Sequence, residues 1–95
     1  MATKVGLLHL DVLIGDAMSL KDKRRVLKSF KDRVANGWNA SIAEVDGHDR
    51  MRSAVLAVAM VGNDARYLQG ALQKIVNAAR AHRAWVLNDY DIELI

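Results

Sequence analysis

The sequence contains no cysteine and no proline. Without cysteine the chain can form no disulfide, no cysteine-ligated zinc site and no thiol nucleophile, and this composition fits a cytosolic protein. Without proline, and with only 6 scattered glycines, no stretch has the composition of a flexible linker or a low-complexity segment. We therefore expect one cytoplasmic domain that spans residues 1–95.

Long apolar runs are also missing. The N-terminal stretch KVGLLHLDVLI, residues 4–14, is interrupted by His9 and Asp11, and this favours a strand over the continuous apolar core of a secretory signal. No stretch reaches the roughly 18 apolar residues that a membrane-spanning helix needs. We therefore expect no membrane association.

The composition itself is that of a folded protein, since 52% of the residues are hydrophobic and 26% are charged. A chain of this length can bury roughly 60–70% of the surface that it exposes when unfolded, which is enough for one modest core. The formal charge of +3 permits attraction to nucleic acid or another anionic surface but does not require it.

Hydrophobic periodicity predicts four strands and two helices in the order βαββαβ. Strands are expected at residues 4–14, 38–46, 51–61 and 84–95, and helices at residues 20–36 and 64–82. Two right-handed split βαβ units in this order form a four-stranded antiparallel sheet, order 4-1-3-2, with both helices on one face. We therefore expect an α+β, ferredoxin-like sandwich, an arrangement that hosts many unrelated functions.

The stretch SLKDKRRVLKSFKDR, residues 19–33, holds half of the chain's 14 Lys and Arg residues. On a helical wheel, basic side chains occupy the face opposite the apolar stripe and its two shoulders. These side chains are Lys21, Arg24, Arg25, Lys28, Lys31 and Arg33. The pattern is open to three interpretations: a solvated face whose aliphatic stems cover the core edge, a contact surface for RNA or another anion, or a protein interface.

Lys23 departs from this pattern because it lies in the middle of the apolar stripe. A buried ammonium group needs a partner. The predicted topology places the start of the first helix near the end of the second strand, where Glu44 faces the helices. We therefore predict a structural ion pair between Lys23 and Glu44.

Further positive charge is expected at this edge of the sheet. His48 and Arg50 lie in the loop 47–50, and His82 and Arg83 follow the second helix. A helix N-terminus with basic neighbours is a physical site for an anion. Arg50 and Arg83 therefore join the residues of the basic helix as candidate anion or RNA contacts.

The sheet face opposite the helices combines acidic and apolar side chains. The side chains expected to align across the first and fourth strands are His9, Asp11, Asp89, Asp91 and Glu93. A hydrated or interface face is the simpler interpretation, and a metal site is the alternative. Asp46, His48 and Asp49 in the hairpin loop allow the same two interpretations, and we assign neither a metal nor another cofactor.

Apolar side chains share this uncovered face. Val5, Leu7 and Leu13 alternate with the residues that face the helices, and the third strand adds small or apolar neighbours. An exposed apolar patch marks a contact surface. We therefore predict a homodimer built through the uncovered face or through a sheet edge.

Several segments together resemble the YlxP-like family, small bacterial proteins of unknown function. They are VGLLHLDVLI, SLKDKRRVLKSFKDR, NASIAEVD, AVLAVAMVGND and DIELI. The resemblance implies a ferredoxin-like fold and offers no catalytic residue to transfer. Genes of this family often lie among those for transcription and translation factors, which favours an RNA- or ribosome-related role.

Binding is therefore the leading interpretation, with RNA or a ribosomal particle as the partner. The first and third strands lack the aromatic residues on which an RRM stacks bases. The stretch GDAMSLKDKR lacks the glycine-rich phosphate loop of acylphosphatases, and no dinucleotide, Walker or paired-histidine motif occurs. We expect no enzymatic activity and identify no small-molecule substrate. The alternative is a homodimeric protein–protein adaptor or regulatory module without nucleic-acid binding.

Overall fold

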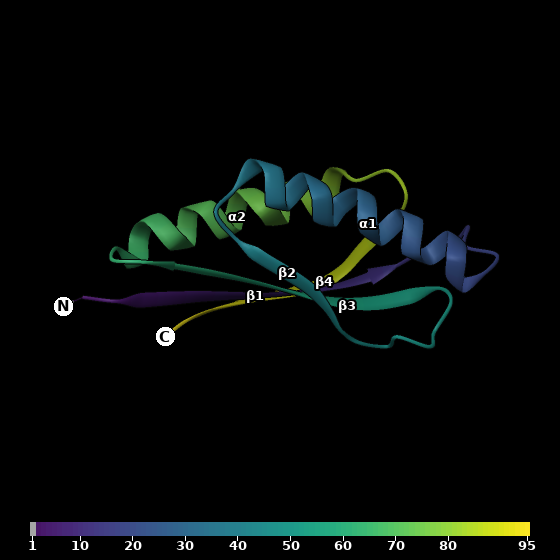
Figure 1. Ribbon diagram of the computed structural model, residues 1–95, viewed down its shortest axis with the longest axis horizontal. Coiled ribbons are helices and arrows are strands. Elements are labelled where there is room, and N and C mark those ends of the chain that lie inside the picture. The colour runs from purple at the N-terminus through teal and green to yellow at the C-terminus, as the bar shows by residue number, and fades with distance from the viewer. Residues whose placement is uncertain (1) are drawn as a thin grey trace.

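The computed structural model describes residues 2–95. Its elements are β1 (Lys4–Leu13), α1 (Leu20–Gly37), β2 (Ser41–Asp46), β3 (Ser53–Gly62), α2 (Ala65–Ala81) and β4 (Val86–Leu94). The strands form one antiparallel sheet in the order β2-β3-β1-β4, which is the predicted order 4-1-3-2 counted from the other edge. Both helices lie on the same side of the sheet and leave its other side uncovered (Figure 1). The predicted α+β fold is confirmed.

β1 is the central strand, because it pairs with β3 along one side and with β4 along the other. Its alternate residues Leu8, Leu10 and Val12 are fully buried beneath the helices. Their neighbours on β3 are Val58, Leu56 and Ala54 in the same order, and these are buried too. The alternation of residues that predicted the strands therefore also shows which side chains of β1 and β3 point into the core.

The helices complete the core with side chains at helical spacing. The buried apolar residues are Leu27, Phe30 and Val34 on α1, and Leu68, Ala71, Leu72, Ile75, Val76, Ala78 and Ala79 on α2. The Oγ of Ser19 accepts a hydrogen bond from the amide of Asp22 at 3.0 Å, and this contact caps the start of α1. Among residues 2–95, no helix is both long and apolar enough to cross a membrane.

Gly6 lies on β1 in close contact with a side chain of α2. A Cβ atom at this position would lie only 2.7 Å from the Cδ1 of Leu72. A larger residue at this position would therefore require at least the end of the Leu72 side chain to move.

The fourth strand departs from the expected alternation. Asp11 pairs with Asp89, but the next pair is Val12 with Leu87, so Asn88 is an extra residue in β4. This bulge reverses the alternation beyond it. A strict period of two would place Val86 on the same face as Tyr90, Ile92 and Leu94, but Val86 pairs with Leu13 on the uncovered face.

Three rings close the core where α2 ends. Phe30, His82 and Trp85 lie with ring centroids 4.5 to 5.6 Å apart, and the indole Nε1 of Trp85 donates to the carbonyl of Ala79 at 2.8 Å. The Nε2 of His82 is buried and has no hydrogen-bond partner within residues 2–95. Burial, and secondly the positive charge of Arg33, lower the pKa of the His82 imidazole below its usual range.

The lowered pKa makes the fold sensitive to acid. Because the folded state favours neutral His82, the unfolded chain binds more protons below about pH 6.5. The free energy of unfolding should therefore fall as the pH decreases from about 7 toward 5. Urea unfolding at each pH measures this dependence. His82→Gln should reduce it, whereas the exposed His48→Gln should leave it unchanged; an equal pH dependence in wild type and His82→Gln would contradict this prediction.

Candidate anion-binding surface on the first helix

Lys23 joins α1 to the turn between β2 and β3. Its side chain is buried, with only 1% of the residue exposed. The Nζ donates to the carbonyl oxygens of Gly47 at 2.7 Å and Arg50 at 2.6 Å, and it lies 2.8 Å from the Oε2 of Glu44. An ammonium group has three donors. Its three partners, Glu44, Gly47 and Arg50, all lie on the segment that ends β2 and forms the turn.

The contact with Glu44 is an ion pair without a well-aligned hydrogen bond. The Oε2 of Glu44 is buried and accepts no well-directed hydrogen bond from the part of the chain that the structure describes. The two carbonyl groups therefore supply the directional bonding of the Lys23 ammonium, and Glu44 balances its charge. This arrangement makes Lys23 a structural residue.

The turn itself is shaped to present those carbonyl groups. Gly47 has a φ of +75°, in the left-handed region that glycine adopts without a steric cost. Its amide donates to the Oδ1 of Asp46 at 2.8 Å, and its carbonyl also accepts from the amide of Arg50 at 2.9 Å. The Gly47 carbonyl thus receives hydrogen bonds from both the turn and α1.

A second contact ties the loop before α1 to the same turn. The Nε of Arg52 donates to the carbonyl of Ala17 at 3.2 Å. In the first turn of the helix, the Oδ2 of Asp22 accepts from the amide of Met18 at 3.1 Å. The start of α1 and the β2–β3 turn lie together at the end of the molecule opposite the two chain termini (Figure 1).

Basic side chains project from the helix that Lys23 holds in place. Lys21, Arg24, Arg25 and Lys28 are exposed, and Lys31 is half-buried. Residues 2–95 contain only two ion pairs, Lys23 with Glu44 and Lys28 with Asp32, the latter at 2.7 Å. The other basic groups of α1 therefore have no carboxylate within 4.0 Å in the described chain.

The two arginines predicted outside the helix lie at the end of the sheet where β1 finishes. Arg50 is exposed, and it lines a hollow with Asp11, Leu13 and other residues. Arg83 is exposed in a second hollow that Leu13 also lines. His82 does not join this positive surface, because its half-buried ring packs against Phe30 at the edge of the core.

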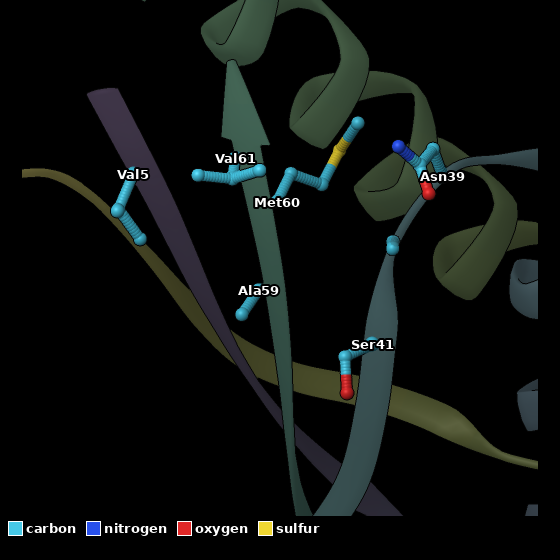
Figure 2. A pocket seen from close by; sticks show the side chains of 7 residues that line it. Val5, Asn39, Ser41, Ala59, Met60 and Val61 are labelled. Atoms are coloured by element: carbon cyan, nitrogen blue, oxygen red, sulfur yellow. The ribbon is translucent and has the colours of Figure 1, made fainter. Parts of the chain in front are cut away.

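A larger hollow, of about 400 Å³, lies elsewhere, where β2 begins beside the end of β3 (Figure 2). Its lining consists of Val5, Asn39, Ala40, Ser41, Ala59, Met60 and Val61. Among these described residues there is no acid, base or thiol. The lining does include the hydroxyl of Ser41, but no described lining residue is a His, Asp, Glu or Lys that could act as a base for it.

The acidic side chains of the uncovered face align across β1 and β4. His9 pairs with Asp91, Asp11 with Asp89, and Leu7 with Glu93. In the hairpin, the Oδ1 of Asp46 is used by the amide of Gly47, while His48 and Asp49 are exposed. The hairpin residues belong to no group of three neighbouring metal-ligand side chains within residues 2–95.

Replacing Lys23 by methionine should destabilise the fold strongly. The Lys23→Met change leaves the Glu44 carboxylate and two turn carbonyls without their cation, and breaking a buried pair in this way costs about 3–5 kcal/mol. Urea unfolding measures the change. The exposed Lys21→Met should stay within about 0.5 kcal/mol of wild type, and a similarly small effect at Lys23 would contradict the structural role assigned to it.

Comparisons with known proteins place the chain in a family. Residues 5–92 match the model of a family described as "Protein of unknown function (DUF503)". The "Uncharacterized protein YlxP" of Bacillus subtilis (strain 168) is 33% identical over 72 residues, which cover 76% of this chain and 78% of that protein.

Two solved structures resemble the fold at low sequence identity. A de novo designed protein, Foldit4, aligns with a TM-score of 0.53 and 12% identity over 97% of this chain and 93% of its own. The cofactor-independent oxygenase SnoaB from Streptomyces nogalater, as the mutant N63A, aligns with a TM-score of 0.44 and 18% identity over 97% and 90% of the chains. The first shows the fold alone, and the second carries no argument. By the family match and the YlxP relative, the chain belongs to the DUF503 family, whose function is unknown.

Proposed function

We propose that this protein binds the phosphate backbone of RNA through the outward face of α1, with a ribosomal particle as the leading target. The observation that carries the proposal is the row of exposed basic side chains at Lys21, Arg24 and Arg25, which have no carboxylate within 4.0 Å in residues 2–95. Ammonium and guanidinium groups without an internal counterion are free to replace the cations that surround a phosphate backbone.

The residue types favour phosphate over base recognition. The planar guanidinium groups of Arg24 and Arg25 can each donate two parallel hydrogen bonds to a phosphate. The described parts of β1 and β3 contain no Phe, Tyr or Trp side chain on which a base could stack. Contacts with phosphate and sugar position a protein without reading sequence, so we expect little sequence preference.

The helix is also held rigidly enough to act as a docking surface. Lys23 fixes the first turns of α1 to the β2–β3 turn through two carbonyl groups, and Leu27 and Phe30 bury the opposite side of the helix. A contact surface that is already ordered avoids most of the entropy cost of ordering on binding. Arg50, exposed in that same turn, lines a hollow with Asp11 and Leu13 on the uncovered face, so it is not counted with the basic side chains of the helix.

Charge reversal at Lys21, Arg24 and Arg25 tests the proposal. Co-sedimentation with bacterial ribosomal particles over a salt series should show wild-type binding that weakens steeply with salt. The triple change to Glu should abolish binding at moderate salt. If three phosphate contacts are involved, each contributes roughly 0.7 to the slope of log K against log salt concentration, so wild type should show a slope near −2 from these residues.

A matched variant controls for net charge. Lys4, Arg66 and Lys74 are exposed and lie on β1 and α2, and their change to Glu alters the net charge by the same amount. This control should bind like wild type. Equal loss in both triple variants, or no binding by wild type at low salt, would contradict the proposal.

A second candidate is a homodimeric adaptor that uses the uncovered sheet face. The observation that favours it is a set of large apolar side chains that remain exposed on that face, among them Leu13 at 43%, Val61 at 60% and Val86 at 66%. Packing a second copy against this face would remove these side chains from water.

Light scattering at micromolar concentration tests the dimer. Wild type should have twice the mass of the chain, and Val61→Lys should be monomeric because it places a charge in the apolar contact. Tyr67→Lys, at a site on α2 that is 66% exposed, should remain dimeric. A monomeric wild type would exclude this candidate and leave the RNA proposal untouched.

A further inference from the structure

The uncovered face carries a group of metal-ligand side chains that the basic helix does not explain. His9 on β1 lies directly opposite Asp91 on β4, and Glu93 follows two residues later on the same face of β4. One ligand atom from each of these three residues lies within 4.8 Å of the other two. The group therefore joins an imidazole to two carboxylates across two paired strands.

Two other carboxylates of this face, those of Asp11 and Asp89, already accept hydrogen bonds from within the chain. Asp11 accepts a hydrogen bond from the Nδ2 of Asn88 at 3.4 Å, and Asp89 accepts one from the amide of Tyr90 at 2.9 Å. Within residues 2–95, no hydrogen bond or ion pair engages the side chains of His9, Asp91 or Glu93. Their lone pairs are available to an external ligand.

The neighbouring charges add a reason for that ligand to be a cation. Asp11 and Asp89 are directly opposed across the two strands, and like charges in that position repel. With Asp91 they line a hollow of about 90 Å³ that His9 also borders. No Lys or Arg forms an ion pair with any of these carboxylates in the described chain. A bound cation would neutralise a concentration of negative charge that the protein itself leaves uncompensated.

We propose that His9, Asp91 and Glu93 bind a divalent transition-metal ion, with Zn²⁺ as the ion that fits the donor set best. Zinc takes imidazole nitrogen together with carboxylate oxygen, and sites with three protein ligands keep a fourth position for water. Calcium and magnesium prefer oxygen ligands alone, so the imidazole selects against them. The open position faces outward, because the helices lie on the other side of the sheet (Figure 1).

The geometry needs only side-chain adjustment to reach coordination. Zinc bonds of about 2.0–2.2 Å at tetrahedral angles place ligand atoms about 3.4 Å apart, compared with the present limit of 4.8 Å. His9 is half-buried, while Asp91 and Glu93 are exposed, so the two carboxylates are free to rotate. The cross-strand pair fixes the backbone positions of His9 and Asp91, and Glu93 closes the site.

Isothermal titration calorimetry of the intact protein with ZnCl₂ tests the site directly. Wild type should bind one ion per chain, and CaCl₂ should give no comparable heat. His9→Gln, Asp91→Asn and Glu93→Gln should each weaken zinc binding at least tenfold. The chemical shifts of the His9 ring protons, followed by NMR in the same titration, should move with occupancy in the wild type.

Matched variants in the hairpin provide the control. His48→Gln and Asp49→Asn remove the same chemical groups from exposed positions and should leave zinc binding unchanged. No heat with wild-type protein at millimolar zinc, unchanged binding in His9→Gln, or an equal loss in His48→Gln would each overturn the proposal. These variants leave α1 intact, so the outcome is independent of RNA binding.

Discussion

The buried ammonium of Lys23 is the interaction on which the arrangement of the first helix depends. Its Nζ is bound by two carbonyl groups of the β2–β3 turn and balanced by Glu44. If α1 moved away, the chain would leave a charge buried without partners, at a cost of several kcal/mol. This constraint holds the first turns of the helix on the β2–β3 turn, while Leu27, Phe30 and Val34 pack the rest of the helix against the core. The exposed basic face of α1 therefore has a defined position relative to the turn that carries Arg50.

The two sides of the sheet carry different chemistry. Cationic side chains gather on α1 above the sheet, whereas the uncovered face holds the carboxylates of β4 beside exposed apolar groups such as Val61 and Val86. The modest net charge of +3 conceals this separation. The first surface is the one proposed for RNA, and the other is the one proposed for a cation or a second copy of the chain. The proposed RNA contact uses α1 and is independent of the other two proposals, whereas the proposed zinc site and the proposed dimer share the uncovered face.

Much of this architecture is predictable from the residues alone, for identifiable reasons. Period-two and helical spacing define the order of elements. A lysine in the apolar stripe requires a partner, and the topology places Glu44 close enough to be that partner. The carbonyl acceptors at Gly47 and Arg50 are not predictable, because a backbone oxygen leaves no signature in residue type. The bulge at Asn88 is hidden for a similar reason, since alternation continues on both sides of it and Val86 changes face. The alignment of His9 with Asp91 and Glu93 is predictable, because a buried face specifies the register. The approach of their ligand atoms to within 4.8 Å depends on side-chain rotamers, which the residue pattern does not specify.

The most direct test of the account is the environment of the Lys23 ammonium in solution. NMR spectra that detect lysine NH₃⁺ groups at neutral pH distinguish a protected ammonium from one that exchanges rapidly with water. The structure predicts a slowly exchanging Lys23 signal with nuclear Overhauser contacts to Gly47 and Arg50. Rapid exchange like that of the exposed Lys21, with no contact to the turn, would contradict the claim that this side chain holds α1 on the sheet.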